Sequence, residues 1–125
     1  MTTKLTFLKG TEPTIIEIVG KELYFFKLNR GIPLRSKLEG LRFLPSEIVK
    51  EFPDLKDKSV EFMKAEAIRR LKSHIKSLNS EPDIIEYLRS DLGKYGYMLK
   101  TIHRDGSRME VVKWMQISYK LFSEQ

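Results

Sequence analysis

Residues 14–28, TIIEIVGKELYFFKL, show a hydrophobic pattern that is typical of two paired strands. The two β-rich runs flank Gly20-Lys21, and glycine at the first position of a two-residue loop favours a type II′ turn. Both faces of this hairpin carry apolar side chains, so we expect both faces to be covered. Residues 4–8, KLTFL, are predicted as a third strand. The turn fixes the register of the hairpin, which pairs Val19 with Glu22, Ile18 with Leu23, Ile16 with Phe25 and Ile15 with Phe26.

The next segment, residues 29–45, reads NRGIPLRSKLEGLRFLP and has two glycines, two prolines and no sustained period. It is predicted to be a connection with at most one short strand near residues 41–43. A short helix is predicted to start at Pro45-Ser46 and to end before Pro53.

The longest helix is predicted to follow Asp54, which would cap it, with Asp57 in the first turn facing the helix dipole. Apolar residues recur along this helix at spacings of three and four, and they form one stripe: Val60, Met63, Ala67, Leu71, Ile75 and Leu78. The basic residues of the same segment fall mostly away from the stripe.

A second, shorter helix is predicted to begin at Ser80-Glu81-Pro82-Asp83, an S-x-x-D capping box with proline in the first turn. Gly93 is predicted to close this helix in the left-handed conformation. Its apolar face would bury Ile84, Ile85, Leu88 and Leu92.

Residues 96–103 and 108–115 are both β-rich, and Asp105-Gly106 between them predicts a type I′ hairpin turn. Leu99 would pair with Val112, and Ile102 with Met109. Residues 111–122 fit either a continued strand or a helix, and the strand is favoured. The order of strands, helices and strands predicts an α+β fold in which the N- and C-terminal hairpins form an antiparallel sheet packed on the central helices, within one domain covering residues 1–125.

The composition of the 125-residue chain excludes several kinds of site. There is no cysteine, which excludes disulfides, thiolate zinc sites and cysteine nucleophiles. No signal-peptide pattern occurs at the start, and no apolar run approaches the ~20 residues that span a bilayer, so a cytoplasmic location without membrane contact is predicted. Asparagine and glutamine are scarce while lysine, glutamate and isoleucine are plentiful, a composition typical of thermophile proteins.

The triplet His103-Arg104-Asp105 matches the first letters of a protein-kinase catalytic loop, but position 110 is Glu where that loop needs asparagine. We therefore interpret the triplet as part of a hairpin. Two histidines, His74 and His103, are too few for a typical catalytic zinc site, and no glycine-rich phosphate loop occurs. No catalytic residue, cofactor or metal ligand is predicted.

The net charge of +6 raises the expectation of an anionic partner, which basic clusters would bind. The densest of three clusters lies on the long helix, and another lies on the C-terminal hairpin. The third lies in the connection and consists of Arg30, Arg35, Lys37 and Arg42. A winged-helix arrangement, in which the shorter helix would read DNA, is disfavoured because that helix is mainly acidic. The candidate phosphate-binding residues from the helix and hairpin clusters are Arg69, Arg70, Lys72, Lys76, Arg104 and Arg108.

Two functions fit these patterns better than an enzyme does. The first is a non-catalytic protein-interaction or assembly module, expected as a homodimer. Its basis is the apolar surplus of Trp114, Phe122 and the two-faced first hairpin. The alternative is sequence-tolerant nucleic-acid binding through the basic clusters of the long helix and the C-terminal hairpin.

Overall fold

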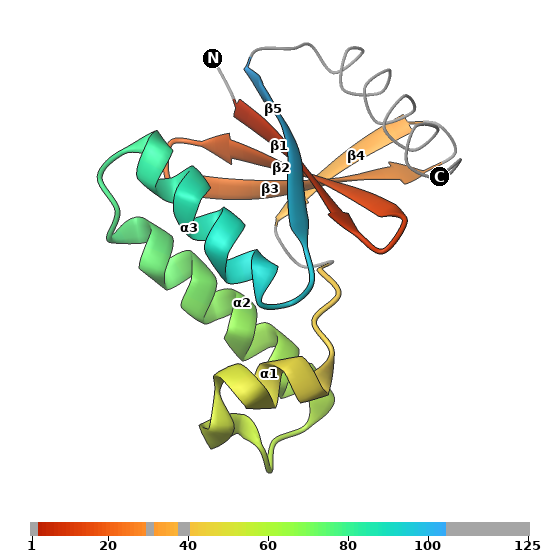
Figure 1. Cartoon of the computed structure of the whole chain (residues 1–125), viewed down its shortest axis with the longest axis vertical. Coiled ribbons are helices and arrows are strands. Elements are labelled where there is room, and N and C mark those ends of the chain that lie inside the picture. Colours follow the sequence, from red (N-terminus) through yellow and green to blue (C-terminus); the bar gives the residue numbers. More distant parts are fainter. Residues whose placement is uncertain (1–2, 30–31, 38–40, 105–125) are drawn as a thin grey trace. The chain divides into compact units, whose positions relative to one another are not determined.

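The computed structural model describes residues 3–29, 32–37 and 41–104 (Figure 1). Its element order confirms the α+β class, with strands from both ends of the chain on either side of a helical segment. The strands are β1 (Thr3–Lys9), β2 (Glu12–Val19), β3 (Glu22–Asn29), β4 (Ile32–Lys37) and β5 (Met98–Arg104). The helices are α1 (Pro45–Glu51), α2 (Val60–Lys76) and α3 (Glu81–Gly93), with a 3-10 turn over Pro53–Leu55.

All five strands belong to one antiparallel sheet with the order β4-β3-β2-β1-β5. Strand β5, the last strand of the described part of the chain, therefore pairs with the N-terminal strand β1. The chain divides into two compact units. We call residues 1–38 and 97–125 the sheet unit and residues 39–96 the helical unit, and each is described separately.

The first hairpin has the predicted register at all four pairs, from Val19–Glu22 to Ile15–Phe26. Gly20 has a φ of 63°, the positive value that the first position of a type II′ turn requires. A second glycine-first loop, Gly10-Thr11, connects β1 to β2 in the same way, and Gly10 also has a φ of 63°. The predicted strand over residues 4–8 is confirmed as β1.

The prediction for residues 29–45 was wrong in one respect. The strand in this segment is β4, at Ile32–Lys37, and residues 41–44 are not a strand. Pro33 lies within β4, although proline usually argues against a strand. Because β4 is an outer strand among those described, the missing N–H of proline does not interrupt the interior of the sheet.

The start of the long helix also differs from the prediction. Ser59, not Asp54, caps α2, because its hydroxyl accepts a hydrogen bond from the Phe62 amide at 3.2 Å. Asp54 lies in the 3-10 turn, and Asp57 precedes the cap instead of lying in the first helical turn. The apolar stripe is confirmed at Met63, Ala67, Leu71 and Ile75, which are buried, whereas Val60 is 45% exposed.

Helix α3 begins at the predicted cap, where the Ser80 hydroxyl accepts a hydrogen bond from the Asp83 amide at 3.3 Å. All four of its predicted apolar residues, Ile84, Ile85, Leu88 and Leu92, are buried. The prediction for Gly93 was wrong, since it is the last helical residue. The left-handed conformation occurs at Gly96, with a φ of 84°.

The predicted C-terminal hairpin is confirmed only in its first strand, β5. The Asp105-Gly106 turn, the pairs Leu99–Val112 and Ile102–Met109, and the strand or helix over residues 111–122 lie outside the described residues. Within the described part of the chain, no helix has the length and apolar character needed to cross a membrane.

Candidate nucleic-acid interface

The four basic residues predicted on the long helix all lie on α2, but carboxylates hold two of them. Arg69 donates two hydrogen bonds to Glu66, at 2.9 and 2.5 Å. Arg70 donates to both oxygens of Asp54, at 3.2 and 2.6 Å, and to Glu66 at 3.2 Å. Two guanidinium groups and two carboxylates therefore form one network whose charges cancel.

The arginines also stabilise the charged form of their partners. The Arg69 guanidinium is the main reason why the pKa of Glu66 falls from 4.5 to about 2. Hydrogen bonding from Arg70 lowers the pKa of Asp54 in the same way. The Arg70 guanidinium carbon lies 4.6 Å from the centroid of the Phe52 ring. A phosphate group that bound these arginines would have to displace ionised carboxylates, which weakens the case for α2 as a phosphate-binding surface.

The other two residues of the α2 cluster are Lys72 and Lys76. Lys72 is half-buried, and Lys76 lies exposed in the last turn. With Arg69 they follow one stripe of the helix, at spacings of three and four, while Arg70 is rotated by about 100° from Arg69. The predicted helix cluster is thus divided between two directions.

The other two candidate residues come from the C-terminal hairpin. Arg104 is exposed at the end of β5, in the sheet unit. Arg108 lies outside the described residues. The α2 cluster belongs to the helical unit, so the candidate residues come from both units of the chain.

The boundaries of the two units reveal an uneven distribution of charge. The helical unit contains eleven Lys/Arg and eleven Asp/Glu residues, and its formal charge is zero. The sheet unit contains twelve Lys/Arg and six Asp/Glu residues, and it carries the whole net charge of +6. An electrostatic attraction to a polyanion would therefore act on the sheet unit.

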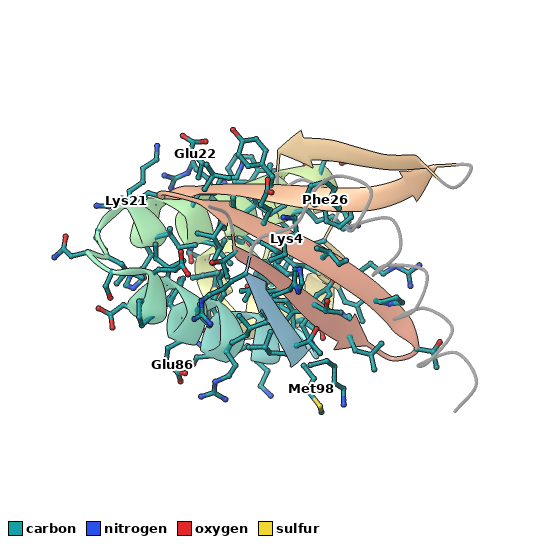
Figure 2. The ribbon with its side chains drawn as sticks, turned by 90° about the horizontal axis from the view of Figure 1, so that it is seen from above. Lys4, Lys21, Glu22, Phe26, Glu86 and Met98 are labelled. Carbon is teal, nitrogen blue, oxygen red and sulfur yellow. The ribbon has the colours of Figure 1, made fainter. Side chains whose placement is uncertain are left out.

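Strand β5 presents a mixture of basic and apolar side chains. Lys100 and Arg104 are exposed, and neither forms an ion pair within the described part of the chain. The strand also carries two exposed large apolar residues, Met98 at 60% and Ile102 at 44%. Figure 2 shows the Met98 side chain projecting away from the ribbon.

The pairing of β5 with β1 is irregular next to Lys100. Thr6 lies opposite Thr101 and Phe7 lies opposite Leu99, so the register passes over Lys100. Such a bulge re-aims a side chain and bends the strand locally.

At one end of the β1–β5 ladder, Lys9 adds a further basic group. Its Nζ lies 5.3 Å from the centroid of the Tyr97 ring, within the range of a cation–π interaction. The Tyr97 ring in turn meets the Phe7 ring edge-on, with centroids 6.5 Å apart. Basic residues thus occur near both ends of β5 and in its middle.

The helical unit contains a different group of ionisable residues, which come from α1, α2, α3 and the turn after α3. Lys94 Nζ lies 2.7 Å from Glu51 Oε1 and 3.9 Å from Asp91 Oδ1. The His74 and Tyr87 rings stack with centroids 4.1 Å apart. Burial raises the pKa of Asp91 and raises the pKa of Tyr87 to about 12.

This group resembles a structural network more than a catalytic site. No hydrogen bond joins His74 to Asp91 in the part of the chain that the structure describes, so an imidazole base oriented by a carboxylate is missing there. Among the described residues, no three His, Cys, Asp or Glu side chains lie close enough to hold a metal ion. The group does tie the ends of three helices together.

A buried ion pair lies in the middle of the sheet unit. Lys4 Nζ and Glu17 Oε2 are 3.5 Å apart across β1 and β2, and their side chains are 2% and 8% exposed (Figure 2 labels Lys4). The Thr6 hydroxyl beside them is buried and has no hydrogen-bond partner in the described structure. His103 is opposite Lys4 on β5, and Tyr24 is opposite Glu17 on β3, so polar residues cross four strands in one row.

Sequence reasoning missed both the charge division and the special position of Lys100. The charge division depends on unit boundaries that composition counts do not reveal. The bulge at Lys100 depends on the pairing of β5 with β1, whose residues lie almost a whole chain apart. The even spacing of Met98, Lys100, Ile102 and Arg104 along the sequence is no guide to a shared face, because the bulge places Met98 and Ile102 on opposite faces of β5.

Comparisons of the chain with protein-family models, curated proteins and solved structures found no match.

Proposed function

We propose that this protein is a non-catalytic interaction module that binds nucleic acid through its sheet unit, with little dependence on base sequence. The observation that supports this proposal is the confinement of the net charge of +6 to the sheet unit, beside a neutral helical unit. Lysine and arginine contacts to phosphates release counterions and supply affinity without reading bases. A cysteine-free basic protein of this kind is consistent with a cytoplasmic location, which stays a prediction.

Binding of labelled oligonucleotides, followed by fluorescence anisotropy, tests this proposal directly. We expect wild-type protein to bind oligonucleotides of different sequence with similar affinity at about 50 mM salt and to lose affinity steeply towards about 200 mM. The far-UV circular dichroism spectrum at each salt concentration controls for unfolding. Absence of binding at the lowest salt concentration, with the fold intact, would refute the proposal.

A homodimer is the second candidate, because five large apolar side chains are exposed on the described surface. Leu44, Val60 and Phe62 lie in the helical unit, and Met98 and Ile102 lie in the sheet unit. The first hairpin no longer supports this candidate, since Ile15, Ile16 and Ile18 are buried within a single chain. Trp114 and Phe122 lie outside the described residues.

Light scattering coupled to size-exclusion chromatography decides between a monomer and a dimer. A dimer whose interface buries about 1,200–2,000 Å² should persist at micromolar concentration. A single species with the mass of one chain at every concentration would exclude self-association of that strength.

A further inference from the structure

Strand β5 combines the three features that a contact strand for a flexible polyanion needs. It carries exposed cations, Lys100 and Arg104, which form no ion pair within the described residues. It carries the exposed apolar residue Ile102 on the same face as Arg104, because these residues pair with Leu5 and Thr3 of β1, whereas exposed Met98 pairs with Leu8 and lies on the other face. It also belongs to the unit that holds the net positive charge.

The bulge explains why Lys100 is available. Because the β1 register passes over this residue, its side chain is not tied to a cross-strand neighbour on β1. Bulges and edge lysines also discourage pairing of a strand with another chain. The arrangement therefore favours contacts made by side chains over addition of a further strand from a partner protein.

We propose that β5 is the contact strand for single-stranded nucleic acid, in which Lys100 and Arg104 bind phosphates while Ile102 contacts unpaired bases. This inference rests on the proposed function of the sheet unit. Lys100 and Arg104 are separated by roughly 13 Å of extended chain, so they contact different phosphates of one strand.

The exposed apolar residue Ile102 favours single-stranded over double-stranded nucleic acid as the ligand of β5. In a duplex the faces of the bases are stacked on one another and only their edges are accessible in the grooves. Bases of a single strand can turn towards a protein and bury their faces against its side chains. Exposed Ile102 gains contacts only in the second case.

The alternative binding surface, α2, has fewer cations available to bind phosphate. Arg69 and Arg70 are engaged by Glu66 and Asp54, and the unit around them has no net charge. Binding there would exchange existing ion pairs for new ones.

Two double charge reversals that change the net charge equally test the location. In the first, Lys100→Glu is combined with Arg104→Glu on β5. In the matched control, Lys56→Glu is combined with Lys64→Glu, which are exposed lysines of the helical unit. Affinity for a short oligo-dT is measured by anisotropy as a function of salt, and circular dichroism confirms that each variant is folded.

We expect the β5 reversal to weaken binding at least tenfold and the control to weaken it less than twofold. The salt slope should fall by about 1.4 for the β5 variant, because each phosphate contact on a single strand contributes about 0.7. The neutral pair Lys100→Gln with Arg104→Gln should give the same loss of slope, and it replaces the reversal if that variant does not fold. Ile102→Ser should weaken binding several-fold without changing the slope.

Equal losses in the β5 variant and the control would overturn the inference, because they would show a dependence on total charge alone. So would a loss confined to Arg69→Glu with Arg70→Glu, or tighter binding of duplex than of single strand. Equal losses or a preference for duplex leave the proposed function in place, because the wild-type protein still binds nucleic acid. A loss confined to Arg69→Glu with Arg70→Glu would also overturn binding through the sheet unit. Failure of the wild-type protein to bind would overturn both the inference and the proposed function.

Discussion

Two ion-pair arrangements in this molecule differ mainly in their exposure to water. Glu66, Arg69, Arg70 and Asp54 form a network on the surface of the helical unit, where solvent and salt screen their attraction. Lys4 and Glu17 instead face each other inside the sheet unit. Removing one partner has a small effect in the first case and takes the opposite charge of an ion pair away from a buried group in the second.

Replacing Lys4 by alanine should therefore lower the free energy of unfolding by about 3–5 kcal/mol, because the Glu17 carboxylate would remain buried without its cation. The double variant Lys4→Met with Glu17→Leu should be about as stable as the wild-type protein, since apolar side chains of similar size often replace a buried pair without loss. Urea denaturation of all three proteins measures both effects. A single variant as stable as the double variant would show that the pair is hydrated.

The surface network predicts a dependence of stability on pH. The pKa of Glu66 falls from 4.5 to about 2 on folding, so the folded state favours its ionised form. This contribution is complete above pH 4.5 and is lost as the pH falls towards 2. Thermal denaturation at pH values from 4.5 down to about 2 should show a smaller loss of stability for Glu66→Gln than for the wild-type protein. Parallel pH profiles for the two proteins would contradict the assigned hydrogen bonds.

At the scale of single elements, the sequence correctly predicted the features that depend on residues close together along the chain. The Gly20 turn, the Ser80 cap and the α3 apolar face all depend on contacts within a few residues. The predictions were wrong where contacts between residues far apart in the sequence determine the local structure. Asp54 has the chemistry of a cap but is held by Arg70, sixteen positions away, and Ser59 takes its place. The β4 strand is formed by pairing with β3 despite its proline.

The apolar stripe of α2 gives a test of packing at the same scale. Leu71→Ala should cost about 2–5 kcal/mol of unfolding free energy, because Leu71 is 2% exposed and the truncation leaves a cavity. Val60→Ala is the matched control on the same helix. Because Val60 is 45% exposed, this variant should lose much less unfolding free energy. Chemical denaturation of both variants measures the difference. Equal midpoints would mean that the Leu71 side chain does not pack in the core.

At the scale of the whole molecule, β5 joins the described sheet by pairing with β1, so the sheet contains strands from distant parts of the chain. Strands β4 and β5 lie at opposite edges of the described sheet and run in the same direction, and the helical unit is inserted between them in sequence. Hydrophobic periodicity identifies single elements but contains no information about such distant pairing. For this reason the strand order, the bulge at Lys100 and the charge of each unit followed only from the structure.

The strand order predicts how hydrogen exchange should vary across the molecule. Amides of β1, β2 and β3 should exchange slowest, because these three strands have neighbours on both sides. Amides of β5 that do not donate to β1 should exchange much faster, since β5 is an outer strand among those described. Two-dimensional nuclear magnetic resonance spectra recorded after transfer to deuterated water give these rates residue by residue. Slow exchange along the whole of β5 would contradict an open edge and would require a further strand beside it. If that protection disappears on dilution, the strand belongs to a second copy of the chain; if it persists, it comes from residues 105–125, and the predicted hairpin at Asp105-Gly106 supplies it.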